Sequence, residues 1–163
     1  MKRVLVVKMS SLGDVIHTLP ALSDAAAARP GIRFDWVVEE AFAEIPGWHP
    51  SVDTVIPVAL RRWRKKPLRD FFGSEWRRAR SALARQRYDA VIDAQGLIKS
   101  AFIARLVKAP RYGLDRKSAR EGLASAVYHH RIAVPRDMHA VERTRQLFSR
   151  SLAYPVSTGP VNY

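Results

Sequence analysis

The sequence predicts one α/β domain, a Rossmann-like parallel sheet with helices on both of its faces. Apolar runs typical of strands alternate with segments in which apolar residues recur at helical spacing. The strand-like runs are almost continuously apolar, which is typical of strands covered on both faces. A chain of 163 residues, 47% hydrophobic and 26% charged, suits one globular domain and excludes a disordered or collagen-like chain. Because it has no Cys, disulfides, a thiolate nucleophile and Cys-based zinc sites are also excluded.

The first half of the chain is expected to contain three strands and two helices. Arg3–Lys8 is a near-continuous apolar run and predicts the first strand. Helical spacing follows over Asp14–Ala28, where Pro20 either kinks the helix or moves its regular part downstream. A strand, a short helix and a short strand are then predicted, in that order, over Arg33–Val38, Glu40–Ile45 and Thr54–Val58.

The second half is expected to alternate in the same way. Ser74 is the expected N-cap of a helix that runs through Gln86, and a helix that is apolar almost all round is expected over Leu97–Val107. The last helix carries apolar residues at helical spacing between Val141 and Leu152. The two strands predicted in this half are Tyr88–Asp93 and Arg111–Leu114.

No segment of the sequence predicts a secretory signal or a membrane span. Lys8 ends the first apolar run early, so that this run is too short for a signal peptide. No later window approaches the roughly 20 apolar residues that a membrane-spanning helix needs. We therefore expect a soluble protein.

Positive charge is the most unusual bulk property of the chain. The formal net charge is +13 at pH 7, and the stretch from Arg61 to Arg87 alone holds eleven basic and two acidic residues. Such an excess favours an anionic partner, which could be nucleic acid, a phosphorylated or carboxylated substrate, or a membrane surface. Codon bias could explain why Arg is abundant, but it does not explain the clustering.

The loop that leaves the first strand is the first candidate site. It reads Lys8-Met9-Ser10-Ser11-Leu12-Gly13-Asp14 and runs into a helix, where hydroxyls and backbone N–H groups can bind an anion. The loop lacks the glycines of a dinucleotide fingerprint and the Gly-Lys-Ser/Thr of a P-loop. Asp14 stands where an N-cap is expected, so the pattern leaves both a structural cap and a catalytic general base open.

Several segments of the chain resemble, in the right order, those of the bacterial lipopolysaccharide heptosyltransferases. The longest is Val6–Leu22, which reads VVKMSSLGDVIHTLPAL. The likeness is strongest to the members that add the first heptose of the inner core. The other matching segments are FDWVVEE from Phe34, IPV from Ile56, RRWRK from Arg61, YDAVIDAQGL from Tyr88 and HAVERT from His139.

The resemblance implies one half of a GT-B glycosyltransferase, in which two Rossmann-like domains face each other across a cleft. Residues 1–154 are then the acceptor-binding domain, and residues 155–163 are an exit segment toward a C-terminal domain that binds the ADP-heptose donor. Nearly all donor-binding residues would lie in that second domain, so this chain alone is expected to be inactive. The family transfers heptose with inversion and without a metal, so no cofactor is expected.

The resemblance also implies roles for individual residues. Asp14 matches the catalytic base, which takes a proton from a Kdo hydroxyl of the acceptor, Kdo-lipid A. Guanidinium groups can bind the carboxylates and phosphates of this acceptor in a bidentate way. The residues expected to bind the acceptor are Lys8, Ser10, Ser11, Gly13, Arg61, Arg62, Arg64, Lys65, Gln95, Arg120 and His139.

Three of these features also have an explanation that involves no ligand. The basic segment from Arg61 to Lys65 could be a solvated loop, and Gln95 could either bind a sugar hydroxyl or cap the following helix. His139 could have a structural role before the last helix. Trp63, which is set among the arginines, is the best tryptophan candidate for a lipid or sugar contact.

The expected location is the cytoplasm, at the cytoplasmic face of the inner membrane, whose anionic lipids attract basic residues. One rival is another ADP-heptose-dependent transferase with a different inner-core acceptor. A second rival is a non-enzymatic nucleic-acid-binding module, which the charge permits. Nucleic acid is not the expected partner, because the sequence has no RNP motif, zinc finger or recognition-helix pattern.

Overall fold

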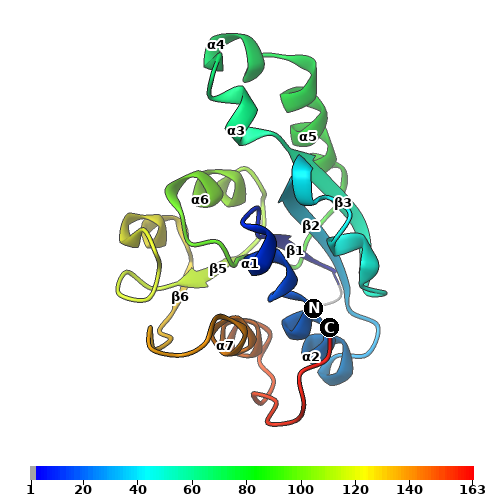
Figure 1. Cartoon of the computed structure of the whole chain (residues 1–163), viewed down its shortest axis with the longest axis vertical. Helices are drawn as coiled ribbons and strands as arrows, with labels where there is room; N and C mark the ends of the chain where they lie inside the picture. Colours follow the sequence, from blue (N-terminus) through cyan, green and yellow to red (C-terminus); the bar gives the residue numbers. More distant parts are fainter. Residues whose placement is uncertain (1–2) are drawn as a thin grey trace.

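A computed structural model describes residues 3–163 and contains one sheet of six parallel strands (Figure 1). The spatial order of the strands is β3-β2-β1-β4-β5-β6. Strands β2 and β3 lie on one side of β1, and β4, β5 and β6 lie on the other, so the order of the strands reverses between β1 and β4. In such sheets, ligands bind at the carboxyl ends of the strands near this reversal. The strands are β1 Arg3–Val7, β2 Arg33–Glu39, β3 Val52–Val58, β4 Ala90–Asp93, β5 Arg111–Leu114 and β6 His130–Ile132.

Helices cover both faces of the sheet. Helices α2 and α7 lie together on one face, and α5 and α6 cover the other (Figure 1). The α-helices are α1 Leu12–Ile16, α2 Leu19–Ala28, α3 Leu60–Trp63, α4 Pro67–Asp70, α5 Ser74–Arg85, α6 Ile98–Arg105 and α7 Ala140–Leu152. Three 3-10 helices lie between them: η1 Glu40–Phe42, η2 Pro46–Trp48 and η3 Gly122–Val127.

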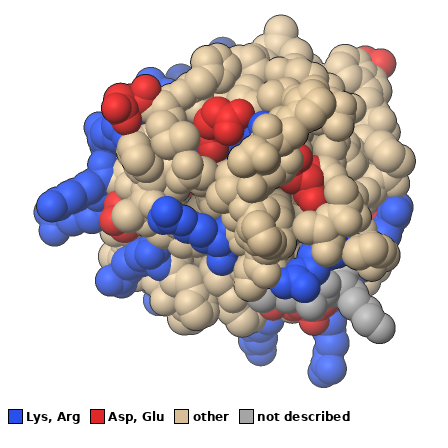
Figure 2. All heavy atoms as spheres, turned by 90° about the horizontal axis from the view of Figure 1, so that it is seen from below, with Lys and Arg blue, Asp and Glu red and all other residues tan. Residues whose placement is uncertain are grey.

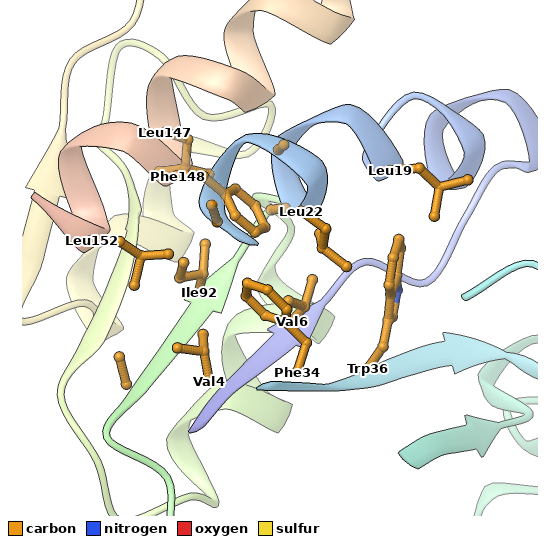
Figure 3. Packing of buried hydrophobic residues seen from close by; sticks show 14 of the residues in the cluster. Val4, Val6, Leu19, Leu22, Phe34, Trp36, Ile92, Leu147, Phe148 and Leu152 are labelled. Atoms are coloured by element: carbon orange, nitrogen blue, oxygen red, sulfur yellow. The ribbon is translucent and has the colours of Figure 1, made fainter. Parts of the chain in front are cut away.

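Strand β1 lies at the centre of the core and is buried on both sides. Val4 and Val6 point to the face covered by α2 and α7 and pack there with residues such as Phe148 (Figure 3). Leu5 and Val7 point to the opposite face and pack against α5 and α6. All four side chains are fully buried. This two-sided burial explains the near-continuous apolar run in the sequence and confirms the predicted Rossmann-like fold class.

The predicted first helix is two helices. Residues 12–16 form α1, and the chain then restarts as α2. Pro20 lies in the first turn of α2, where a missing N–H costs no helical hydrogen bond. Pro20 therefore moves the regular helix downstream, which is one of the two alternatives that the sequence left open.

Two other local predictions are wrong, and one strand is missing from the predicted elements. The N-cap of α5 is Gly73 rather than Ser74, which is the first helical residue. The expected helix Glu40–Ile45 is the single 3-10 turn η1. Strand β6 was not predicted, because it is only three residues long and two of them, His130 and Arg131, are exposed.

No helix within residues 3–163 has the length and apolar character needed to cross a membrane. Past Tyr154, the described chain forms neither helix nor strand. The domain boundary at residues 154 and 155 stays a prediction.

His49 joins α2 to the segment before β3 and is almost fully buried, with 6% of its surface exposed. Its Nδ1 accepts a hydrogen bond from the backbone N–H of Ser51 at 3.1 Å, and its Nε2 lies 3.0 Å from the Ser23 hydroxyl. Burial, followed by the charge of Arg33, lowers the pKa of His49 below its usual value of 6.5. Folding therefore favours the neutral form of this ring.

The free energy of unfolding is expected to decrease as the pH falls below 6.5, because the unfolded chain then takes up a proton that folded His49 resists. Denaturant unfolding of the wild type and of His49→Gln between about pH 7 and about pH 5 measures this contribution. The variant should be less stable at neutral pH and should lose less of its stability on acidification. An identical pH dependence in both proteins would contradict the role given to His49.

Candidate functional site

A cleft lies at the carboxyl ends of β1, β4 and β5, where the sheet order reverses. It has a compact part of about 200 Å³ that reaches α7 and a more open part of about 580 Å³ that reaches α3. Asp14, Gln95 and Arg120 line both parts, and we call the two together the Asp14 cleft. Of the predicted site residues, the cleft brings together Lys8, Ser10, Ser11, Asp14, Arg61, Gln95 and Arg120.

Asp14 lies in the first turn of α1, three residues after the N-cap. The N-cap residue is Ser11, and the Asp14 side chain completes a capping box with it, so Asp14 takes part in the cap without being the N-cap residue. One oxygen of its carboxylate, Oδ2, accepts hydrogen bonds from the backbone N–H of Ser11 at 3.3 Å and from its hydroxyl at 3.2 Å. These contacts hold the partly buried carboxylate at the point where both parts of the cleft meet.

In the described chain, three cations line the same part of the cleft as this carboxylate. Lys8, Arg120 and Arg143 line the compact part of the cleft together with Asp14. Lys8 donates from Nζ to the carbonyl oxygen of Ala94 at 3.1 Å. Burial lowers the pKa of Lys8, an effect that Asp14 opposes and that Arg143 and Arg120 add to. The compact part of the Asp14 cleft thus combines a carboxylate that can accept a proton with cations that attract anions.

The residues of the basic segment from Arg61 to Lys65 lie in different surroundings in the structure. The buried carboxylate of Glu39 accepts hydrogen bonds from the backbone N–H groups of Leu60 and Arg61, at 3.2 and 3.0 Å, and so fixes the start of α3. Arg61 then lines the open part of the cleft. Arg64 and Lys65 are exposed and are not among the described residues that line it.

Arg62 is engaged elsewhere. Its guanidinium forms ion pairs with Glu75 and with Glu40, the latter at 3.1 Å. The hydrogen bonds that Arg62 donates to Glu75 and, to a smaller extent, to Glu40 raise the pKa of Arg62, and the same pairing lowers the pKa of Glu75. All three groups are exposed, so an anionic ligand would have to compete with these carboxylates for Arg62.

Trp63 is not a ligand contact. Only 2% of its surface is exposed, and its ring packs edge-on against Phe71 and Trp76, with 5.9 Å between the ring centres in each pair. The expectation of a lipid or sugar contact is therefore wrong. The segment around Trp63 folds into two short helices, α3 and α4, and these bury the tryptophan while the arginines stay outside.

The two remaining predicted residues lie beside the cleft. His139 is the N-cap of α7, and its Nδ1 accepts a hydrogen bond from the backbone N–H of Val141 at 3.2 Å. Its ring meets that of His17 edge-on at 5.5 Å. Gly13 lies in α1 and is exposed. Neither residue is among those that line the Asp14 cleft in the described chain.

Sequence reasoning missed Arg143 and Thr144, which also line the compact part. Both belong to the HAVERT segment, so a signal was present. They lie one turn into α7, and the packing of α7 against α2 and β5 turns them toward the cleft. Arg143 donates to the carbonyl oxygens of Pro135 at 3.0 Å and Ser118 at 2.7 Å, and these bonds hold its guanidinium in place.

The positive charge of the described residues does not form one continuous patch on the face of the molecule that Figure 2 shows. On the face that Figure 2 shows, basic side chains lie mainly toward the edges, and acidic side chains lie among the uncharged residues. Within residues 3–163, no group of three or more His, Asp or Glu side chains is arranged to hold a metal ion. The carboxylate of Asp14 can take a proton from a hydroxyl of an anionic ligand, and the cations in the cleft can bind the charge of that ligand.

Comparison with known proteins shows which family this chain resembles. A model of glycosyltransferase family 9 (heptosyltransferase) matches residues 76–162. Lipopolysaccharide heptosyltransferase 1 of Pseudomonas aeruginosa is 61% identical over 162 residues, which cover 99% of this chain and 46% of that protein. The corresponding protein of Escherichia coli K12 is 56% identical over 153 residues, which cover 93% of this chain and 48% of that protein. The chain thus spans about half the length of the curated relatives it matches.

The solved structure of E. coli heptosyltransferase WaaC with ADP has the same fold. It superposes with a TM-score of 0.95 at 53% identity, covering 98% of this chain and 50% of that chain. This chain and the solved structure therefore agree in the arrangement of their strands and helices as well as in sequence.

Proposed function

This chain belongs to glycosyltransferase family 9, the heptosyltransferases, and we propose that it is the acceptor-binding part of a lipopolysaccharide heptosyltransferase 1. The reaction is the inverting transfer of L-glycero-D-manno-heptose from ADP-heptose to a Kdo hydroxyl of Kdo-lipid A. The observation that carries this proposal is the position of Asp14 between Lys8, Arg120 and Arg143 at the carboxyl ends of the strands. A sugar acceptor that carries carboxylates and phosphates fits such a cleft.

Asp14 acts as the general base. Its carboxylate takes the proton from the acceptor hydroxyl as that oxygen attacks the anomeric carbon of the heptose, and ADP leaves with the electrons of the broken bond. The hydrogen bonds from Ser11 orient the carboxylate. Lys8, Arg120 and Arg61 bind the anionic groups of the acceptor and so place its hydroxyl near Asp14.

The donor is ADP-heptose, held mainly by a second domain that follows residues 1–154. Two observations support this division. The matched relatives are about twice as long as this chain, and a structure of the E. coli relative was solved with ADP-2-deoxy-2-fluoro heptose. The cleft of this chain then faces the donor across the space between the two domains.

A transfer assay tests the proposed reaction. The intact heptosyltransferase that contains this chain is supplied with ADP-heptose and either Kdo-lipid A or the same acceptor already carrying one heptose. Mass spectrometry should show one added heptose on Kdo-lipid A alone. Addition to the heptosylated acceptor alone would indicate the rival transferase, which acts later on the inner core.

We further propose that the protein works in the cytoplasm, attached peripherally to the anionic inner face of the membrane. Large apolar side chains that are at least half exposed lie on α6 and around α4. They are Leu68, Phe72, Ile98 and Phe102, with exposed basic residues Lys65, Lys66, Arg69 and Arg105 in the same elements or next to them. This apolar surface adjoins the Asp14 cleft, because Lys99 and Glu121 line both. Apolar residues with a basic rim are typical of membrane-binding surfaces.

Replacing two of these aromatic residues is expected to weaken membrane binding. The double variant Phe72→Ser/Phe102→Ser should bind vesicles that contain anionic phospholipid at least about 10-fold more weakly than the wild type, because it loses two large apolar groups that bury in the lipid. Co-sedimentation with the vesicles measures this. Trp48→Ser, which removes an aromatic residue that is 61% exposed on η2, is the matched control. Equal loss of binding in the control, or none in the double variant, would contradict the assignment of this surface.

A further inference from the structure

Asp93, at the end of β4, anchors the loop that follows it. Its side chain is fully buried. One carboxylate oxygen accepts hydrogen bonds from the backbone N–H groups of Gln95 at 2.9 Å and Gly96 at 3.2 Å. The other accepts from the hydroxyl of Ser100 at 2.9 Å and from that of Tyr128. Donors from the loop, from α6 and from the end of η3 thus converge on this one carboxylate, which fixes the backbone at residues 95 and 96.

Gln95 also contacts the neighbouring loop, which leads from β1 to α1. Its side-chain carbonyl oxygen, Oε1, accepts hydrogen bonds from the backbone N–H groups of Met9 at 3.0 Å and Ser10 at 3.2 Å. These two residues come directly before Ser11, whose N–H and hydroxyl hold Asp14. Gln95 therefore links the end of β4 to the segment that carries the general base.

Regular secondary structure in the described chain offers no other hydrogen-bond acceptor to the backbone N–H groups of Met9 and Ser10. Met9 and Ser10 lie beyond the end of β1 and before the start of α1. Both residues are buried, with 1% and 8% of their surfaces exposed. Loss of the Gln95 oxygen would leave two buried donors unsatisfied, and the loop would have to move to find new partners.

We propose that Gln95 is a positioning residue for heptosyl transfer, which holds the loop of Asp14 through its side-chain oxygen and is itself fixed by Asp93. This inference rests on the proposed function, in which Asp14 is the base. The Gln95 oxygen does not cap α6, whose N-cap is Leu97, and it is already engaged by two backbone N–H groups. Small displacements of a reacting group lower the rate much more than the affinity.

Two substitutions of similar size separate this role from a direct contact with the acceptor. Gln95→Glu keeps an oxygen that can accept from Met9 and Ser10, whereas Gln95→Leu removes it. In the intact heptosyltransferase, Gln95→Leu should lower kcat by about 10- to 100-fold, with the KM for Kdo-lipid A changed less than about 3-fold. Gln95→Glu should restore most of the lost kcat. Gln86→Leu, an exposed glutamine at the end of α5, is the matched control.

A second variant covers the case in which Gln95→Leu does not fold. Tyr128→Phe removes one donor from Asp93 with little change in shape, and it should lower kcat about 3-fold or more with an unchanged KM for the acceptor. Thermal unfolding of each variant shows whether it is folded at the assay temperature.

The outcomes are distinguishable. A rise in KM with unchanged kcat in both Gln95 variants would show that the amide contacts the acceptor and would overturn the inference. Equal loss of kcat in Gln95→Glu and Gln95→Leu would overturn it as well, because the side-chain oxygen would then not be what matters. If the wild type itself transfers no heptose to Kdo-lipid A, the proposed function fails.

Discussion

Asp14→Asn is expected to lower kcat for heptosyl transfer by about 10²- to 10⁴-fold, the usual contribution of a general base. The KM for Kdo-lipid A should change little, because the cations that bind the acceptor remain. Asn keeps a side-chain oxygen that can accept from the Ser11 N–H and hydroxyl, so the loop should stay in place. The substitution therefore removes the base while preserving its surroundings.

Steady-state kinetics of the intact enzyme measure this effect. Asp137→Asn removes the charge of an exposed aspartate in the segment before α7 and serves as the control, with an expected change of less than about 2-fold. If Asp14→Asn instead raised the KM and left kcat intact, Asp14 would bind the acceptor and another group would be the base.

Trp63→Ala is expected to lower the free energy of unfolding by about 3–5 kcal/mol, as for other large aromatic residues removed from a core. The Trp63 ring packs against Phe71 and Trp76 and belongs to the core cluster between the sheet and α5. Its removal would leave a cavity where α3 and α4 rest on α5. The basic segment that carries Arg61 would then lose its support, so acceptor binding should weaken too.

Denaturant unfolding of this chain measures the loss of stability. Trp48→Ala is the control, because that ring is 61% exposed, and it should change the stability by less than about 0.5 kcal/mol. A similar small change in Trp63→Ala would contradict the buried position of Trp63.

The sequence predicts the fold where one physical cause dominates. Strand β1 is buried on both faces, so its residues are apolar in succession, and this pattern is visible without a structure. Strand β6 pairs through backbone hydrogen bonds and exposes His130 and Arg131, so no apolar pattern marks it. Trp63 shows the opposite case, because its charged neighbours suggest exposure, whereas the fold of α3 and α4 buries it.

The candidate site is predictable in its location but not in its contacts. Residues that follow parallel strands lie at one edge of the sheet, which is why Lys8, Asp14 and Gln95 meet. Which atom of Gln95 faces which backbone group depends on the distance between two loops. Arg143 depends in the same way on how α7 packs on α2 and β5. Such tertiary contacts are not encoded in the spacing of a single segment.

Titration of this chain with de-acylated Kdo-lipid A tests most directly whether the Asp14 cleft binds a sugar acceptor. The measurement is made at two salt concentrations, with and without an oligonucleotide of matched charge, on the wild type and on Arg120→Ala. We expect saturable binding that survives the oligonucleotide and weakens at least about 10-fold in Arg120→Ala, because a guanidinium that binds the acceptor's anions is lost. Complete displacement by the oligonucleotide, with a steep dependence on salt and no effect of Arg120→Ala, would contradict the assignment. The basic residues would then form a general electrostatic surface rather than an acceptor site.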